Sequence, residues 1–237
     1  HIIEHVSRFF KETSSSYLTE LKKRAKDNGV KNNLIMVGGI GDLGDMDTVK
    51  RGKSVESHYQ WIDIANYLGC LAIRVNAYGG GSREELAKHF AESLYNLGEY
   101  AAKEKINVIV ENHGGASSDV PWLLGVMRQV NLKNVGILPD FGNFCIRKTK
   151  TDGCVEEYDR YLGVKELMPY AKGVSAKSYD FDAAGRETTI DYTRMLRIVK
   201  DSGFKGIIGV EYEGNRLSEY EGIRATKRLI ENVLNSI

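Results

Sequence analysis

Short runs of apolar, mostly β-branched residues alternate with amphipathic helical segments along the whole chain, and this alternation constrains the fold more than any other feature. Successive runs are spaced by about 30 to 37 residues, the length of one strand–helix unit. The runs are continuous rather than alternating with polar residues, as expected of parallel strands that are buried on both faces. The predicted strands are Leu34–Val37, Leu71–Val75, Ile106–Val110, Val135–Leu138, Gly173–Ala176 and Ile207–Val210.

Three of the intervening segments carry an apolar stripe with helical periodicity. Two of them follow the capping pattern Ser-x-x-Glu, which begins at Ser82 in one case and at Ser218 in the other. The third spans roughly residues 47–68. Strands that alternate with helices in this way predict an α/β protein with a parallel sheet.

Composition excludes several classes of protein. The net charge is +1 with both signs interspersed, which argues against nucleic acid or an anionic membrane as a partner. No apolar run approaches the roughly 18 residues that a membrane span needs. The 237 residues suit one α/β barrel, and with only 3 prolines and no Pro- or Ser-rich linker we expect a single domain over residues 1–237. The three cysteines (Cys70, Cys145 and Cys154) are widely spaced, and we interpret them as reduced thiols rather than as disulfides or a zinc cluster.

A glycine-rich segment raises an alternative to the barrel. Residues Gly39–Gly44 match G-x-G-x-x-G directly after a predicted strand, a pattern typical of dinucleotide binding by an open, doubly wound sheet. However, Asp42, Asp45 and Asp47 would repel a pyrophosphate, and the next helix is predicted to begin near Asp47, after the glycines rather than within them. We therefore interpret the segment as a mobile loop near the mouth of a pocket.

Polar side chains follow five successive predicted strands. In a (β/α)₈ barrel the carboxyl ends of the strands converge on one mouth, where catalytic groups are found. A single polar residue at such a place needs no functional explanation, but three converging carboxylates require a cation or a shared proton to offset their repulsion. We therefore predict a (β/α)₈ barrel with one polar pocket. The residues concerned are Arg74, Asn76, Glu111, Asn112, His113, Asp140, Asn143, Ser175, Lys177, Asp180, Glu211, Tyr212 and Glu213.

Four motifs in this set resemble those of the sugar phosphate isomerase/epimerase family, within the xylose isomerase-like TIM barrel superfamily. The resemblance covers nearly the whole chain in order. It is specific for the superfamily, which also contains ketose 3-epimerases, inosose dehydratases and endonuclease IV, but not for a substrate. The motifs are Val110-Glu-Asn-His-Gly-Gly115, Leu138-Pro-Asp-Phe-Gly-Asn143, Val174-Ser-Ala-Lys-Ser178 and Gly209-Val-Glu-Tyr-Glu-Gly214.

The resemblance implies one divalent metal ion, with Glu111, Asp140 and Glu211 as ligands. Ser175 stands where the family often has a histidine ligand and is the expected fourth residue of the metal site, and Asn143 stands where the family has a substrate-binding histidine. Because the imidazole is missing, the resemblance favours Mn²⁺ or Mg²⁺ and leaves Zn²⁺ or Co²⁺ as alternatives. The histidine-rich trinuclear zinc site of endonuclease IV cannot be built from the 5 histidines of this chain.

The chemistry that the resemblance implies is isomerisation or epimerisation of a small carbohydrate through an enediolate. Glu111 and Glu211 would exchange the carbon-bound proton, and Lys177 would support the oxyanion or else form a structural ion pair with Asp140 or Glu211. Two alternatives stay open: a lyase or dehydratase acting on a keto-sugar or keto-glycoside, and a carbohydrate-binding protein without turnover. The expected substrate-binding residues are Arg74, Asn76, His113 and Asn143.

The amino-terminal segment adds a further expectation. Counting His1–Glu4 as a strand gives seven strands, whereas a (β/α)₈ barrel has eight. Residues 2–10 resemble the second strand of the family and its following loop, so we expect the first βα unit to be missing from this chain. A signal peptide would lie upstream, which leaves the compartment open between cytoplasm and export. The oligomeric state is equally open, with a homo-oligomer as one option.

Overall fold

The computed structural model describes residues 1–237, which divide into two compact units. The first unit comprises His1–Glu111 and Pro121–Gly136, and the second comprises Asn112–Val120 and Ile137–Ile237. No helix is both long enough and apolar enough to cross a membrane. In chain order the elements are β1 (Ile2–Val6), η1 (Ser7–Phe9), α1 (Ser15–Asp27), β2 (Lys31–Met36), α2 (Thr48–Leu68), β3 (Ala72–Val75), α3 (Arg83–Lys103), β4 (Asn107–Glu111), η2 (Gly115–Ser118), α4 (Val120–Val130), β5 (Val135–Leu138), β6 (Cys145–Thr149), β7 (Gly153–Glu157), α5 (Arg160–Leu167), η3 (Met168–Tyr170), β8 (Val174–Ser178), α6 (Tyr192–Asp201), β9 (Ile208–Tyr212) and α7 (Glu219–Ser236).

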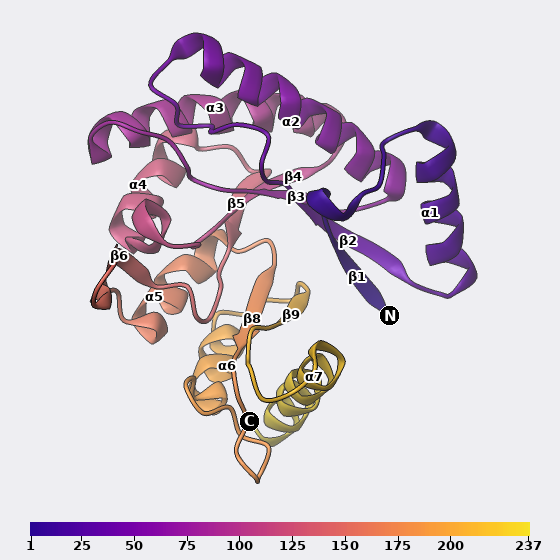
Figure 1. The fold of residues 1–237 in the computed structure, drawn as a ribbon, viewed down its shortest axis with the longest axis vertical. Coiled ribbons are helices and arrows are strands. Elements are labelled where there is room, and N and C mark those ends of the chain that lie inside the picture. Colours follow the sequence, from indigo (N-terminus) through magenta and orange to yellow (C-terminus); the bar gives the residue numbers. More distant parts are fainter. The chain divides into compact units, whose positions relative to one another are not determined.

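The first unit is built on parallel strands in the order β1-β2-β3-β4. Strand β5 is the fifth strand of this sheet, and the boundary between the two units falls within it. Helices α2 and α3 lie side by side against the sheet, and α1 lies beside β1 and β2 (Figure 1). Strands β3 and β4 are buried almost throughout, which explains their continuous apolar sequence.

Helices α2, α3 and α7 begin where the sequence predicts. Asp47 caps α2 by accepting hydrogen bonds from two backbone amides of the first turn. Both Ser-x-x-Glu patterns form complete capping boxes, with Ser82 at the start of α3 and Ser218 at the start of α7. These interactions are local in sequence, and this is why they are predictable.

The glycine-rich segment Gly39–Gly44 links β2 to α2, and the helix begins after it, as predicted. Two of its glycines are explained by packing. A Cβ on Gly41, whose φ is +104°, would lie 2.2 Å from Ser54 Oγ, and a Cβ on Gly44 would lie 2.9 Å from the Tyr78 carbonyl oxygen. The mobility of this loop stays a prediction.

The second unit continues the parallel arrangement. The chain beyond β5 bridges to β8 at Asp140 and Ser175, and β8 pairs in parallel with β9. Helices α6 and α7 contact one another, and α7 contacts β9. The buried Tyr192 of α6 donates its hydroxyl to the backbone carbonyls of Ala176 and Lys177, which anchors the helix to β8.

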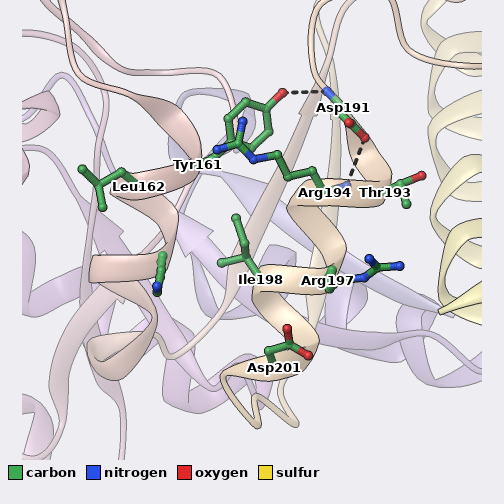
Figure 2. A pocket seen from close by; sticks show the side chains of 9 residues that line it. Tyr161, Leu162, Asp191, Thr193, Arg194, Arg197, Ile198 and Asp201 are labelled. Carbon is green, nitrogen blue, oxygen red and sulfur yellow. Dashed lines mark hydrogen bonds between the residues drawn. The ribbon is translucent and has the colours of Figure 1, made fainter.

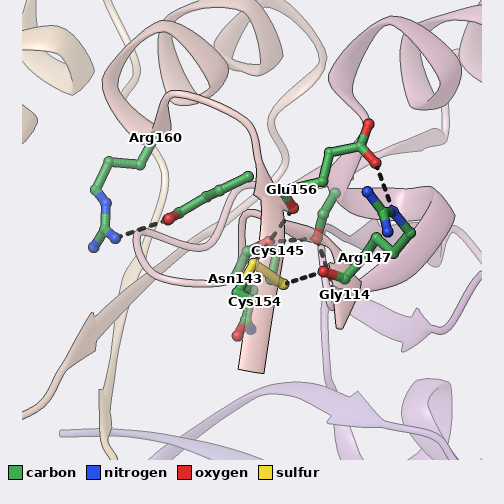
Figure 3. Close-up of a disulfide and its surroundings, with 9 residues drawn as sticks. Gly114, Asn143, Cys145, Arg147, Cys154, Glu156 and Arg160 are labelled. Carbon is green, nitrogen blue, oxygen red and sulfur yellow. Dashed lines mark hydrogen bonds and ion pairs between the residues drawn. A yellow bond between two sulfur atoms is a disulfide. The ribbon is translucent and has the colours of Figure 1, made fainter. Parts of the chain in front are cut away.

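An antiparallel hairpin of β6 and β7 follows the Asp140 loop. Its cysteines, drawn in Figure 3, differ from our expectation that all cysteines are reduced. Cys145 and Cys154 form a disulfide across it, with their Cα atoms 5.8 Å apart, so the interpretation of all three cysteines as reduced thiols was wrong for this pair. The strands are polar and mostly exposed, so no apolar run marks them, and a turn at Gly153 (φ +69°) brings the two cysteines together. Cys70 is a free thiol, as predicted, and burial raises its pKa to about 12.

Candidate active site

In the first unit, three of the predicted site residues form one hydrogen-bonded and ion-paired group, of which Arg74 and Glu111 are buried. Arg74 lies on β3, Asn76 follows that strand, and Glu111 is the last residue of β4. Arg74 Nε lies 2.9 Å from Glu111 Oε2, and Arg74 Nη1 donates to Asn76 Oδ1 at 2.9 Å. The buried charge of Glu111 is therefore compensated by a guanidinium that a second side chain holds in place.

In the second unit, Asp140 is completely buried just beyond β5. Its Oδ1 accepts hydrogen bonds from the amides of Gly142 and Asn143, both at 2.8 Å, whereas its Oδ2 is buried and has no hydrogen-bond partner. Burial raises the pKa of the Asp140 carboxyl to about 7, against the opposing effect of the Lys177 ammonium. This carboxyl group thus presents one buried oxygen without a hydrogen bond, close to the charge of the Lys177 ammonium.

Lys177 and Glu211 form the centre of the second group. The Lys177 side chain is 0% exposed, and its Nζ lies 2.8 Å from Glu211 Oε1 and 3.0 Å from Glu213 Oε1. Burial alone would lower the pKa of Lys177, but the charges of Asp140 and Glu211 outweigh it and leave that pKa raised. Lys177 is therefore a fixed cation and not a neutral nucleophile.

Ser175 completes this group. Its Oγ donates to Glu211 Oε2 at 2.9 Å, and carboxylate oxygens of Asp140 and Glu211 lie within 4.8 Å of each other. The structural ion pair considered for Lys177 therefore exists with Glu211. Lys177 has a second partner in Glu213, which follows the end of β9. The sequence signal for this pair is the spacing of two from Glu211, because alternate residues of an extended chain project to the same side.

The predicted substrate-binding residues His113 and Asn143 lie in the loops after β4 and β5. The backbone of His113 is held by Ser117, whose Oγ accepts its amide at 2.9 Å. Asn143 lies in the same turn as Asp140, and its carbonyl accepts hydrogen bonds from Ser118 Oγ and Asn112 Nδ2. Substrate binding by His113 and Asn143 stays a prediction. The sequence predicts no role for Asn112, whose side chain is buried against this turn.

A separate surface pocket between α5 and α6 contains none of the predicted site residues (Figure 2). Arg194 stacks over the ring of Tyr161 at 3.9 Å, and the Tyr161 hydroxyl accepts the amide of Asp191 at 2.9 Å. These side chains satisfy one another and hold no converging carboxylates, so this pocket is the weaker candidate for an active site.

Comparison with known proteins agrees with this architecture. No curated protein sequence matches the chain. Solved structures match over most of it: L-ribulose 3-epimerase has a TM-score of 0.79 at 15% identity, over 99% of this chain and 84% of that one. For 3-keto-D-glucoside 4-epimerase of E. coli the TM-score is 0.73 at 15% identity, over 92% and 85%. A xylose isomerase-like TIM barrel protein of Mycobacterium smegmatis in complex with magnesium has a TM-score of 0.71 at 18% identity, over 99% and 84%.

At these identities the likeness to solved structures concerns the fold. The family assignment comes from the sequence itself, because the model of one family matches nearly the entire chain, over residues 2–233. The chain belongs to the xylose isomerase-like TIM barrel family.

Proposed function

We propose that this protein is a divalent-metal-dependent epimerase or isomerase of a small carbohydrate, acting by proton transfer at a carbon next to a carbonyl group. The observation that carries the proposal is the buried Asp140 Oδ2, which has no hydrogen-bond partner and lies in a cluster with Glu211. A buried carboxylate oxygen without a donor is a place for a cation. The similar solved structures that are named as sugar epimerases lend the substrate class its support.

The side chains at this position fit a divalent metal. Asp140 and Glu211 would be ligands, with Ser175 as a neutral oxygen ligand. Glu111 would be the third carboxylate, as the likeness of the Val110–Gly115 motif to the family implies. A set made only of oxygens favours Mn²⁺ or Mg²⁺, with Zn²⁺ or Co²⁺ as alternatives. When bound, the ion would polarise the substrate oxygens and so acidify the neighbouring C–H bond.

The protein's own groups would move the proton. Glu211, with 31% of its side chain exposed, is accessible to a substrate, and Lys177 and Ser175 hold its carboxylate in one orientation. It would act as one base and Glu111 as the other, one removing the proton and the other returning it. The Lys177 ammonium would stabilise the negative charge that develops on the substrate oxygen. Arg74, Asn76, His113 and Asn143 would bind hydroxyl groups.

Substitution of Glu211 tests the proposal. Glu211→Gln keeps the shape but removes both charge and basicity, so kcat/KM for a ketose should fall by about 10³-fold or more. The matched control is Glu231→Gln, which removes an exposed carboxylate on α7 and should retain full activity. Metal analysis and calorimetric titration of the wild type with Mn²⁺ complete the test. A wild type that turns over a sugar but binds no metal at millimolar concentration would contradict the mechanism.

A second candidate function uses the same group. The buried ammonium of Lys177 would stabilise the negative charge on a departing oxygen, which would give a lyase or dehydratase acting on a keto-sugar or keto-glycoside. Product analysis separates the two functions, because a lyase releases water or an alcohol whereas an epimerase conserves the mass of its substrate. Binding of a sugar with neither turnover nor metal would instead indicate a carbohydrate-binding protein.

A further inference from the structure

Asn112 is fully buried, and the side-chain hydrogen bonds it forms all go to the backbone of the turn that carries Asp140. Its Oδ1 accepts the Asp140 amide at 2.8 Å. Its Nδ2 donates to the carbonyls of Asp140 and Asn143, both at 3.1 Å. Both hydrogens of the amide nitrogen and one lone pair of the oxygen are therefore used, which is close to the full capacity of a carboxamide.

These bonds occupy one side of the Asp140 backbone, and β8 occupies the other. The Ser175 amide donates to the Pro139 carbonyl at 2.9 Å, and the Phe141 amide donates to the Ser175 carbonyl at 3.1 Å. Asn112 thus supplies the pair of hydrogen bonds that a neighbouring strand would otherwise make to Asp140. With its backbone held on both sides and its Oδ1 bound by two amides, the Asp140 carboxylate has its Oδ2 fixed in direction.

We infer that Asn112 is a positioning residue, which aims Asp140 Oδ2 into the candidate metal site through the backbone of the Asp140–Asn143 turn. The inference rests on the proposed function for the identity of the metal site that Asp140 Oδ2 faces. The positioning of the turn by Asn112 does not depend on that function. Ser118 supports the same turn, because its Oγ donates to the Asn143 carbonyl at 2.6 Å and accepts the Gly114 amide at 2.9 Å.

The chemistry of the side chain explains why an amide stands here. An aspartate has nearly the same size and could still accept the Asp140 amide, but it has no hydrogens for the two carbonyls. Its charge would also face those carbonyl oxygens in a buried place. Asn112→Asp is therefore the sharpest test, since it changes two donors into acceptors without removing volume.

Three measurements on Asn112→Asp test the inference: Mn²⁺ affinity by calorimetry, amide hydrogen exchange of the metal-free protein over residues 139–143, and kcat and KM for a ketose. We expect Mn²⁺ affinity to fall at least 10-fold, exchange of the Phe141, Gly142 and Asn143 amides to become at least 10-fold faster, and kcat to fall while KM changes little. The matched control is Asn134→Ala, whose Nδ2 also bonds to backbone carbonyls but at the other end of β5. It should lower thermal stability and leave all three measurements at wild-type values.

Ser118→Ala keeps the test decisive if Asn112→Asp does not fold, because it removes only the outer support and should shift the same measurements less, in the same direction. Wild-type Mn²⁺ affinity together with wild-type amide exchange in a folded Asn112→Asp protein would overturn the inference. If Asn112→Asp cannot be made, a Ser118→Ala protein with wild-type Mn²⁺ affinity and wild-type amide exchange would overturn it. A wild type that neither binds Mn²⁺ nor turns over a ketose would contradict the proposed function. The exchange measurement on metal-free protein would still decide whether Asn112 positions the turn.

Discussion

Lys177 and Glu211 are register partners on the parallel strands β8 and β9, and the Lys177 Nζ lies 2.8 Å from Glu211 Oε1. Because side chains of paired residues project to the same face of a sheet, the register itself brings the ammonium to the carboxylate. The ammonium is fully buried, whereas the carboxylate is partly exposed. The pair therefore consists of a buried cation and a carboxylate that solvent and substrate can reach. Substitution of Lys177 consequently tests the effect of the buried partner on the accessible one.

Replacing Lys177 with Met should lower both stability and activity. The variant leaves Asp140 and Glu211 without their nearest cation, and loss of one partner of a buried pair costs about 3–5 kcal/mol. Because Glu211 is partly exposed, we expect about 2 kcal/mol for the free energy of unfolding. We expect kcat/KM for a ketose to fall about 10²-fold or more, since the developing charge on the substrate loses its counterion.

Lys172→Met is the control for this substitution, because Lys172 is an exposed lysine just before the same strand. Chemical denaturation and steady-state kinetics measure both effects. A Lys177→Met protein with the activity of the wild type would restrict the ion pair to a purely structural role.

Metal-free wild-type protein should lose more stability than the metal-free Asp140→Asn variant as the pH rises from about 5 to about 7. The pKa of Asp140 is raised by burial to about 7 from an ordinary value of 3.8, so the folded state holds a proton that the unfolded state has lost. The stability that this bound proton contributes is fully present below the pKa of Asp140 in the unfolded state. It is lost as the pH rises through the pKa of Asp140 in the folded state. The expected slope is on the order of 1 kcal/mol per pH unit.

Urea denaturation at several pH values measures this slope. Asp140→Asn should remove it, whereas replacement of the exposed Asp201 by Asn should leave it unchanged. A pH slope of the metal-free wild type equal to that of Asp140→Asn would show that Asp140 is ionised in the folded state over this range.

The disulfide of the β6–β7 hairpin should stabilise the protein when it is oxidised. It closes a loop of sequence separation 9, and a loop of this size is worth up to about 3 kcal/mol in the chain-entropy model. Reduction with a dithiol should therefore lower the melting temperature by about 5 °C. The double variant Cys145→Ser/Cys154→Ser should melt at the lower temperature with or without the reductant. Mass spectrometry that finds both thiols free in protein purified without reductant would rule out the bond.

Much of the fold follows from patterns that are local in sequence. Continuous apolar runs predicted the strands that carry the site, and Ser82 and Ser218 predicted the starts of α3 and α7, because each signal depends on neighbours within a few residues. The carboxyl ends of parallel strands lie at one edge of a sheet, and this allowed Asp140, Ser175, Lys177 and Glu211 to be predicted as one group. The roles of these residues stay predictions.

What the sequence did not reveal depends on contacts between distant segments. The Cys145–Cys154 bond needs a hairpin whose strands are polar and exposed, so no apolar periodicity in the sequence indicates this hairpin. The environment of Asn112 depends on a turn 28 residues further along the chain, and nothing in the neighbouring sequence indicates that its carboxamide bonds to backbone rather than to a substrate. Burial and hydrogen-bond geometry supply that distinction.

The central claim is that the protein moves a proton at a carbon atom of a small sugar, with Glu211 as a base and a divalent metal bound. Incubation of the protein with D-fructose or L-ribulose and Mn²⁺ in D₂O, followed by NMR of the product, tests it most directly. The account predicts an epimer with one deuterium on the carbon that was deprotonated, or an isomer with one deuterium on the neighbouring carbon that receives the proton, because the bases exchange their protons with solvent. It also predicts that chelation of the metal or Glu211→Gln abolishes this incorporation. A product whose carbon-bound hydrogen has not exchanged, or one formed equally fast after chelation, would contradict it.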